Sequence, residues 1–124
     1  MSADPYSDEV RELFNEPRHA GRLDDGISVR EDAQGVRVEL SAIAGGGLLT
    51  ALGFRVWGCP HLIAAAEAVC ARFEGREARE LEGFRTAQIM EILAIPVEKT
   101  GRILVLEDAV RSLGQAVRGR SDEA

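Results

Sequence analysis

One cysteine stands where a strand pattern ends and a helix pattern begins. Residues 54–58 alternate between the two faces of a half-buried strand, and Cys59 follows directly. Pro60 suits the first turn of a helix, because the N–H that proline lacks would have no partner there. A thiol at a helix N-terminus lies at the positive end of the helix dipole, which favours the thiolate. Cys59 is therefore the first candidate for metal, sulfur or redox chemistry.

Two histidines are the other candidate ligands. His61 lies two residues after Cys59, so it is either a metal or proton partner of the thiol or a solvated residue of the first helical turn. A different metal site could combine His19 and His61 with a carboxylate such as Glu16 or Asp24. No serine–histidine–acid or paired-carboxylate pattern is recognisable, and we expect the chain not to be an enzyme.

The remaining cysteine, Cys70, is expected to be structural. If both cysteines lie on one helix, their eleven-residue spacing separates them by about 16 Å, which is too far for a disulfide. Cys70 shares an apolar helix face with Val69 and Phe73, where a free cysteine usually acts as a small hydrophobic residue. Unpaired cysteines are typical of a reducing compartment, so we expect a cytoplasmic location.

The composition predicts one globular domain spanning residues 1–124, with disordered ends at 1–4 and 119–124. The chain is 45% hydrophobic and 29% charged, with a formal net charge of −6. This acidity argues against a nucleic acid or an anionic membrane as the main partner. No apolar run is long enough to span a membrane.

Hydrophobic periodicity predicts an α+β fold. Three strand patterns are joined by glycine-containing turns and form a three-stranded antiparallel sheet, with helices packed on one face. Trp57 would be an aromatic anchor for a partner if it is exposed, although a helix could equally cover it. The expected strands span 27–30, 36–44 and 48–58. A first helix is expected after Ser7, and further helices are expected over 60–74, 77–81, 84–94 and 100–117.

Four segments resemble the iron–sulfur cluster scaffold family of the IscU type, also found as the NifU amino-terminal domain. They occur in the family's order along nearly the whole chain, and they are Tyr6-Ser-Asp-Glu-Val10 with Pro17-Arg18 and Gly21, Phe54-Arg-Val-Trp-Gly-Cys59, Ile95-Pro-Val-Glu-Lys99 and Leu106-Glu-Asp-Ala109. The resemblance implies a [2Fe–2S] cluster, or zinc, bound at three cysteines with help from an aspartate and a histidine. It also implies a cysteine desulfurase or a chaperone as partners, and we further expect that the chain could form a homodimer.

The chain departs from this family at most of the ligand positions. Carried across without a gap, the resemblance places Cys59 at the second cysteine but Gln34 and Val36 at the first cysteine and the aspartate. Gly101 and Arg102 occupy the family's histidine and third cysteine, so Arg102 becomes a neighbour for a thiolate or another anion at Cys59. A cluster or structural zinc needs four ligands, so neither is expected to bind stably to one chain.

Two functions therefore remain open. In the first, the chain is a divergent scaffold-like protein whose Cys59 carries sulfur or shares a cluster between two copies. In the second, it is a pseudo-scaffold that binds or regulates partners without metal or cluster chemistry. The second function predicts that Cys59→Ser leaves partner binding intact.

Overall fold

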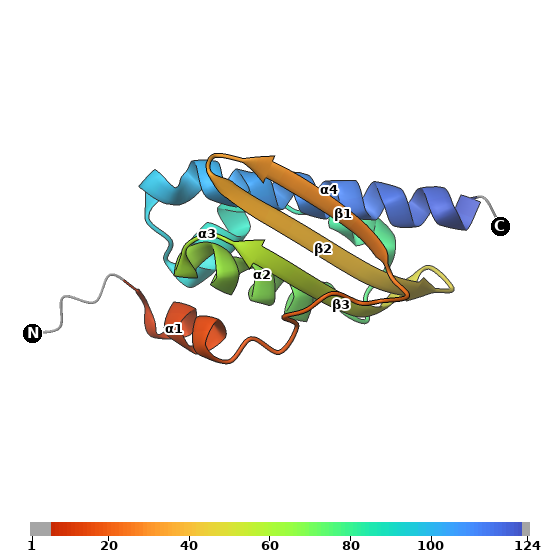
Figure 1. The fold of residues 1–124 in the computed structure, drawn as a ribbon, viewed down its shortest axis with the longest axis horizontal. Helices are drawn as coiled ribbons and strands as arrows, with labels where there is room; N and C mark the ends of the chain where they lie inside the picture. The colour runs from red at the N-terminus through yellow and green to blue at the C-terminus, as the bar shows by residue number, and fades with distance from the viewer. Residues whose placement is uncertain (1–5, 123–124) are drawn as a thin grey trace, which may run out of the picture.

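The structure is a computed structural model that describes residues 6–122. The disorder predicted for residues 1–4 falls outside this range, as does that predicted for 123–124. Figure 1 shows the elements, which in chain order are α1 (Asp8–Asn15), β1 (Ile27–Ala33), β2 (Val36–Gly45), β3 (Leu48–Trp57), α2 (Pro60–Phe73), the 3₁₀-helix η1 (Ala78–Gly83), α3 (Thr86–Leu93), the 3₁₀-helix η2 (Val97–Lys99) and α4 (Thr100–Asp122).

The three strands form an antiparallel meander in the order β1-β2-β3. Each hairpin turns on two residues with positive φ, 52° and 74° at Gln34–Gly35 and 61° and 81° at Gly46–Gly47. Positive φ at both central positions matches the twist of the flanking strands. The prediction that β1 ends at residue 30 is wrong, because the turn uses only two residues and the ladder continues until Ala33 pairs with Val36.

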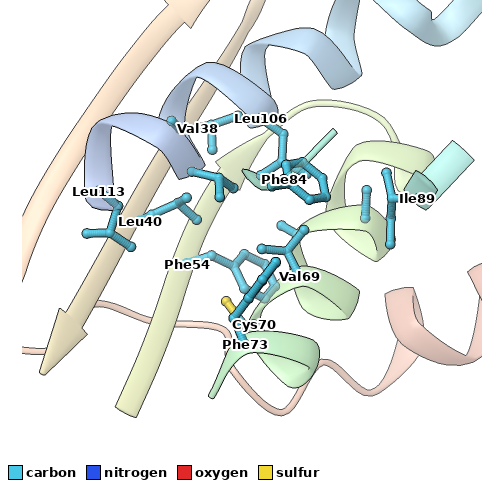
Figure 2. Packing of buried hydrophobic residues seen from close by; sticks show 14 of the residues in the cluster. Val38, Leu40, Phe54, Val69, Cys70, Phe73, Phe84, Ile89, Leu106 and Leu113 are labelled. Atoms are coloured by element: carbon cyan, nitrogen blue, oxygen red, sulfur yellow. The ribbon is translucent and has the colours of Figure 1, made fainter. Parts of the chain in front are cut away.

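The hydrophobic core lies between one face of the sheet and the helices α2 and α4, as the sequence predicts (Figures 1 and 2). Leu40 of β2, Phe54 of β3 and Leu106 of α4 are each at most 3% exposed. Cys70 belongs to the same cluster and is 2% exposed, in agreement with its expected structural role (Figure 2). The predicted α+β class, with helices on one face of a three-stranded sheet, is confirmed.

Residues 6–23 form an N-terminal arm that wraps around the edge of β3. Its helix α1 begins at Ser7, whose Oγ accepts from the N–H of Val10 at 3.2 Å, and Val10 is fully buried. After α1 the backbone of Ala20 pairs in parallel with Phe54 on the edge of β3 that β2 leaves free. The arm then crosses the outer face of the sheet, where Leu23 N–H donates to Ser41 Oγ at 3.2 Å.

Two helical segments differ from their predicted bounds. The helix α4 continues to Asp122, so the disorder predicted from residue 119 is wrong for residues 119–122. Val117 is 1% exposed and anchors the helix, and each further turn then adds hydrogen bonds without a new nucleation cost. The helix predicted over 84–94 begins only at Thr86, because Phe84 is the cap residue of η1.

Within residues 6–122, no helix combines the length and the apolar character needed to cross a membrane.

Gly53 sets how closely the arm approaches the sheet. A Cβ at this position would lie 2.6 Å from the carbonyl oxygen of Gly21 and 3.2 Å from Ser41 Oγ. We expect Gly53→Ala to lower the free energy of unfolding by about 1–3 kcal/mol, because the arm backbone must move. Urea denaturation measures this change. Gly45→Ala is the matched control, since nothing lies within 4 Å of its Cβ, and an equal loss in both variants would contradict the prediction.

Candidate functional site

Cys59 is held at the junction between β3 and α2. It is the N-cap residue of α2, and its carbonyl oxygen accepts from Leu62 N–H at 3.0 Å and from Ile63 N–H at 3.1 Å. The preceding Gly58 packs so closely that a Cβ there would lie 2.8 Å from Leu62 Cδ2 and 3.2 Å from Val36 Cγ1. The backbone before the thiol is therefore fixed against both the sheet and the helix.

The surroundings of Cys59 favour its thiolate. Partial burial alone would raise the pKa of the thiol, but Leu62 N–H and the Arg102 guanidinium lie beside the sulfur and oppose this effect. The positive charges of Lys99 and Arg102 act in the same direction, so the pKa of Cys59 is held below its ordinary value. The structure thus places Arg102 beside Cys59.

The other family ligand positions gather at the same end of the molecule. The Gln34 side chain lies against the first turn of α4, where its Oε1 is 3.4 Å from the position of a Cβ on Gly101. Val36 lies against Gly58, next to Cys59. The fold therefore brings together the positions that the resemblance assigns to ligands, although only one of them carries a thiol.

These residues do not fit a cluster or a zinc ion held by one chain. Arg102 has no lone pair to offer, and its positive charge beside Cys59 repels a metal cation. Among residues 6–122, no three His, Cys, Asp or Glu side chains are arranged to hold a metal ion.

His61 is buried, so its interpretation as a solvated first-turn residue is wrong. The side chain is 2% exposed, and its ring centroid lies 4.7 Å from that of Tyr6 in the N-terminal arm. Neither ring nitrogen has a hydrogen-bond partner within the described part of the chain. Burial lowers the pKa of His61, and the nearby charge of Lys99 lowers it further while Glu98 opposes.

His19 takes part in a different cluster. Its ring lies between Glu67 Oε2 on Nδ1 and Glu74 Oε1 on Nε2, the latter at 3.2 Å. Each ring nitrogen therefore already has a carboxylate partner. The structure does not support the metal site hypothesised for His19 with His61 and Glu16 or Asp24.

Sequence reasoning missed the His19–Glu67–Glu74 cluster. Its signal is Glu67, a carboxylate on the apolar face of α2 between Ala66 and Val69, since a buried charge requires a partner. The exposure of Trp57, which the sequence left open, is 46%, and the Arg37 and Arg55 guanidinium carbons lie 5.4 and 5.1 Å from its ring centroid.

Replacing Arg102 tests the electrostatics of the thiol. We expect Arg102→Gln to raise the pKa of Cys59 and to slow its alkylation by iodoacetamide several-fold near neutral pH, because the thiolate loses a neighbouring cation. The alkylation rate against pH, followed at Cys59 by peptide mass spectrometry, measures both effects. Arg55→Gln is the control, since Arg55 is not among the groups that act on Cys59. Equal rates for the two variants would contradict the assignment.

Adding zinc tests the fit of a metal. A site filled at about 100 times its Kd would add about 2.7 kcal/mol to the free energy of unfolding. We expect no stoichiometric rise in Tm when Zn²⁺ is added to chelator-free protein, because the site offers one thiol beside a guanidinium. A rise that saturates at one ion per chain would overturn this expectation.

Comparison with known proteins agrees with the geometry. The iron–sulfur cluster assembly scaffold protein IscU of Azotobacter vinelandii is 26% identical over 117 residues, covering 86% of this chain and 89% of that protein. IscU of Haemophilus influenzae is also 26% identical, over 114 residues, covering 86% of this chain and 90% of that protein.

A solved structure shares the fold. The crystal structure of a nitrogen-fixing NifU-like protein (N-terminal) from Brucella abortus superposes with a TM-score of 0.72 at 17% identity, covering 95% of each chain. Residues 5–120 match the family described as the NifU-like N terminal domain. The chain therefore belongs to the NifU-like N-terminal domain family.

Proposed function

We propose that this chain is a divergent scaffold-like protein of iron–sulfur cluster assembly that carries sulfur on Cys59. The family supports the scaffold-like function. The observation that carries the finer proposal is a thiol whose pKa is lowered, beside Arg102, at a place where other ligand positions hold Gln34 and Gly101. Such a site stabilises an anionic sulfur and offers too few ligands for a metal.

The sulfur would arrive as the outer atom of a persulfide on a donor protein. The Cys59 thiolate attacks that outer sulfur, a new S–S bond forms at Cys59, and the S–S bond of the donor breaks. The donor leaves as a thiolate, and the transferred sulfur, which keeps its proton during the attack, then loses that proton to water to give the persulfide anion. No external oxidant or reductant is needed, because one sulfane sulfur has exchanged between two thiolates.

The residues around Cys59 have separate parts in this step. Arg102 and Lys99 stabilise the attacking thiolate and then the persulfide anion, which also carries a negative charge. The Leu62 N–H, at the start of α2, acts in the same way. The close packing of Gly58 fixes the backbone before Cys59, so the thiol keeps its position when the donor binds.

The proposed donor is a cysteine desulfurase, and a chaperone is a second candidate partner. Support comes from exposed apolar side chains in two segments that contribute to the site, β3 and the η2 region. Val97 lies in the segment between α3 and α4 and is 81% exposed, and Trp57 precedes the thiol by two residues. Exposed aromatic and apolar anchors of this kind are typical of protein interfaces.

Sulfur transfer is tested with a cysteine desulfurase, cysteine and radiolabelled sulfur. We expect one labelled sulfur per chain on wild-type protein, released by a reductant, and none on Cys59→Ser. Cys70→Ala is the matched control and keeps the label, since Cys70 is 2% exposed and burial raises the pKa of its thiol. Mass spectrometry of the peptide that contains Cys59 locates the added atom.

The same experiment separates the two functions. Label on Cys70, or none on wild-type protein under conditions that label a competent scaffold, would exclude sulfur transfer to Cys59. If wild type and Cys59→Ser then bind the desulfurase equally well, the pseudo-scaffold function stands in its place.

A further inference from the structure

The N-terminal arm makes its apolar contact with the core through Val10, together with the partly buried Tyr6 and Leu13. Its helix α1 has eight residues, of which Val10 alone is buried, and Phe14 is 39% exposed. An isolated helix of this length is unstable in water. The arm therefore depends on specific polar contacts, including that of Ser7 Oγ, which donates to the carbonyl oxygen of Leu93 at 3.1 Å.

His19 makes several of these polar contacts. Its backbone N–H donates to Glu67 Oε1 at 2.7 Å, and its ring Nδ1 lies against the other oxygen of the same carboxylate. Ring Nε2 lies 3.2 Å from Glu74 Oε1, while Glu74 Oε2 accepts from Leu52 N–H of β3 at 2.9 Å. One histidine thus ties the arm to α2 and, through Glu74, to β3.

Both ring contacts require a protonated histidine. A carboxylate can only accept hydrogen bonds, and imidazolium has two N–H donors, whereas neutral imidazole has one donor and one lone pair. Once neutral, His19 can donate to Glu67 or to Glu74, and the other carboxylate faces a lone pair. Glu67 is 2% exposed, so it cannot turn to solvent for compensation.

We propose that His19 is a proton-controlled latch: while protonated it holds residues 6–23 against α2 and β3, and on losing its proton it releases the arm and uncovers His61. Tyr6, at the start of the arm, packs against His61 with the two rings tilted by 54°, so release exposes a buried imidazole two residues from Cys59. This inference does not rest on sulfur transfer.

Charged side chains surround His19 on the α1 segment and on α2. Glu12 and Glu16 of the α1 segment and Arg18 line a hollow of about 340 Å³ beside it, together with Glu67 and Glu74. Cys70 of α2 also lies close, but burial raises the pKa of its thiol and keeps it neutral. The strand β3 contributes backbone groups. Leu52 N–H donates to Glu74, and Phe54 N–H donates to the His19 carbonyl oxygen at 3.0 Å.

The direction of the pH dependence follows from the two shifted groups. Burial alone would lower the pKa of His19, but its contacts with Glu67 and Glu74 raise it above the ordinary 6.5. The latch is therefore at full strength below about pH 6.5 and weakens as pH rises through the folded pKa of His19. Leu52 N–H and His19 lower the pKa of Glu74. The stabilisation from the Glu74 carboxylate is therefore lost only in acid, as pH falls through the folded pKa of Glu74.

Hydrogen exchange on the full chain measures opening directly. Amide exchange is followed by mass spectrometry from about pH 5.5 to about pH 8.5, around the ordinary histidine value, and corrected for the intrinsic rate. We expect residues 8–21 to lose protection by about tenfold to a hundredfold over this range, the equivalent of one charge-assisted hydrogen bond. Protection of α4 should stay constant. Protection of residues 8–21 that does not change with pH would overturn the proposal.

Three variants assign the effect to the latch. His19→Gln, which cannot be protonated, should give low protection of residues 8–21 at all pH values. Glu74→Gln keeps an acceptor for Leu52 N–H but loses its charge, so the midpoint should move to lower pH. Glu16→Gln is the control, because Glu16 lines the same hollow but is not a partner of the His19 ring. This variant should leave the midpoint unchanged.

Chemical modification reports on His61. Diethyl pyrocarbonate acylates neutral imidazole, and at one fixed pH we expect faster modification of His61 in His19→Gln than in wild type. If His19→Gln does not fold, the midpoint shift of Glu74→Gln decides the question alone. The latch is excluded if His19→Gln folds and retains the wild-type pH dependence, or if neither the shift nor the faster modification occurs.

Discussion

The strand β3 is the element on which the rest of the structure depends. One edge pairs with β2, the other with the arm at Ala20, and its end leads directly into α2. Two glycines make this possible, because Gly53 lets the arm cross the sheet and Gly58 lets α2 begin against it. The thiol site and the latch are attached to the same strand, although they lie on different parts of it.

The candidate site has the electrostatic character of an anion site. In a metal centre the protein supplies negative or neutral donors to a cation, whereas here Lys99 and Arg102 place positive charge around a sulfur. The family fold is retained and the ligand positions still converge. The residues at these positions, however, favour a negatively charged group in place of a metal cation. This reversal leads us to propose transfer of an anionic sulfur, and it disfavours storage of a cluster on one chain.

Local patterns predicted the elements and missed contacts between distant segments. Alternation and glycine turns located the strands, and the cap at Ser7 located α1. The end of β1 was predicted too early because Gln34, a residue that seldom has positive φ, forms half of the turn. The burial of His61 depends on Tyr6 from the arm, and periodicity within α2 carries no information about it. The expectation that Arg102 neighbours Cys59 came from the resemblance alone, since local patterns carry no information about this pair.

The burial of Cys70 leaves each chain with a single available thiol, and this has a consequence for symmetry. Two copies that share one bridging atom through Cys59 would meet in an isologous contact, with that atom on the twofold axis. The same axis would bring the two Arg102 guanidinium groups toward each other, and like charges oppose such a pairing. A twofold contact at Cys59 would therefore have to keep the two Arg102 side chains apart.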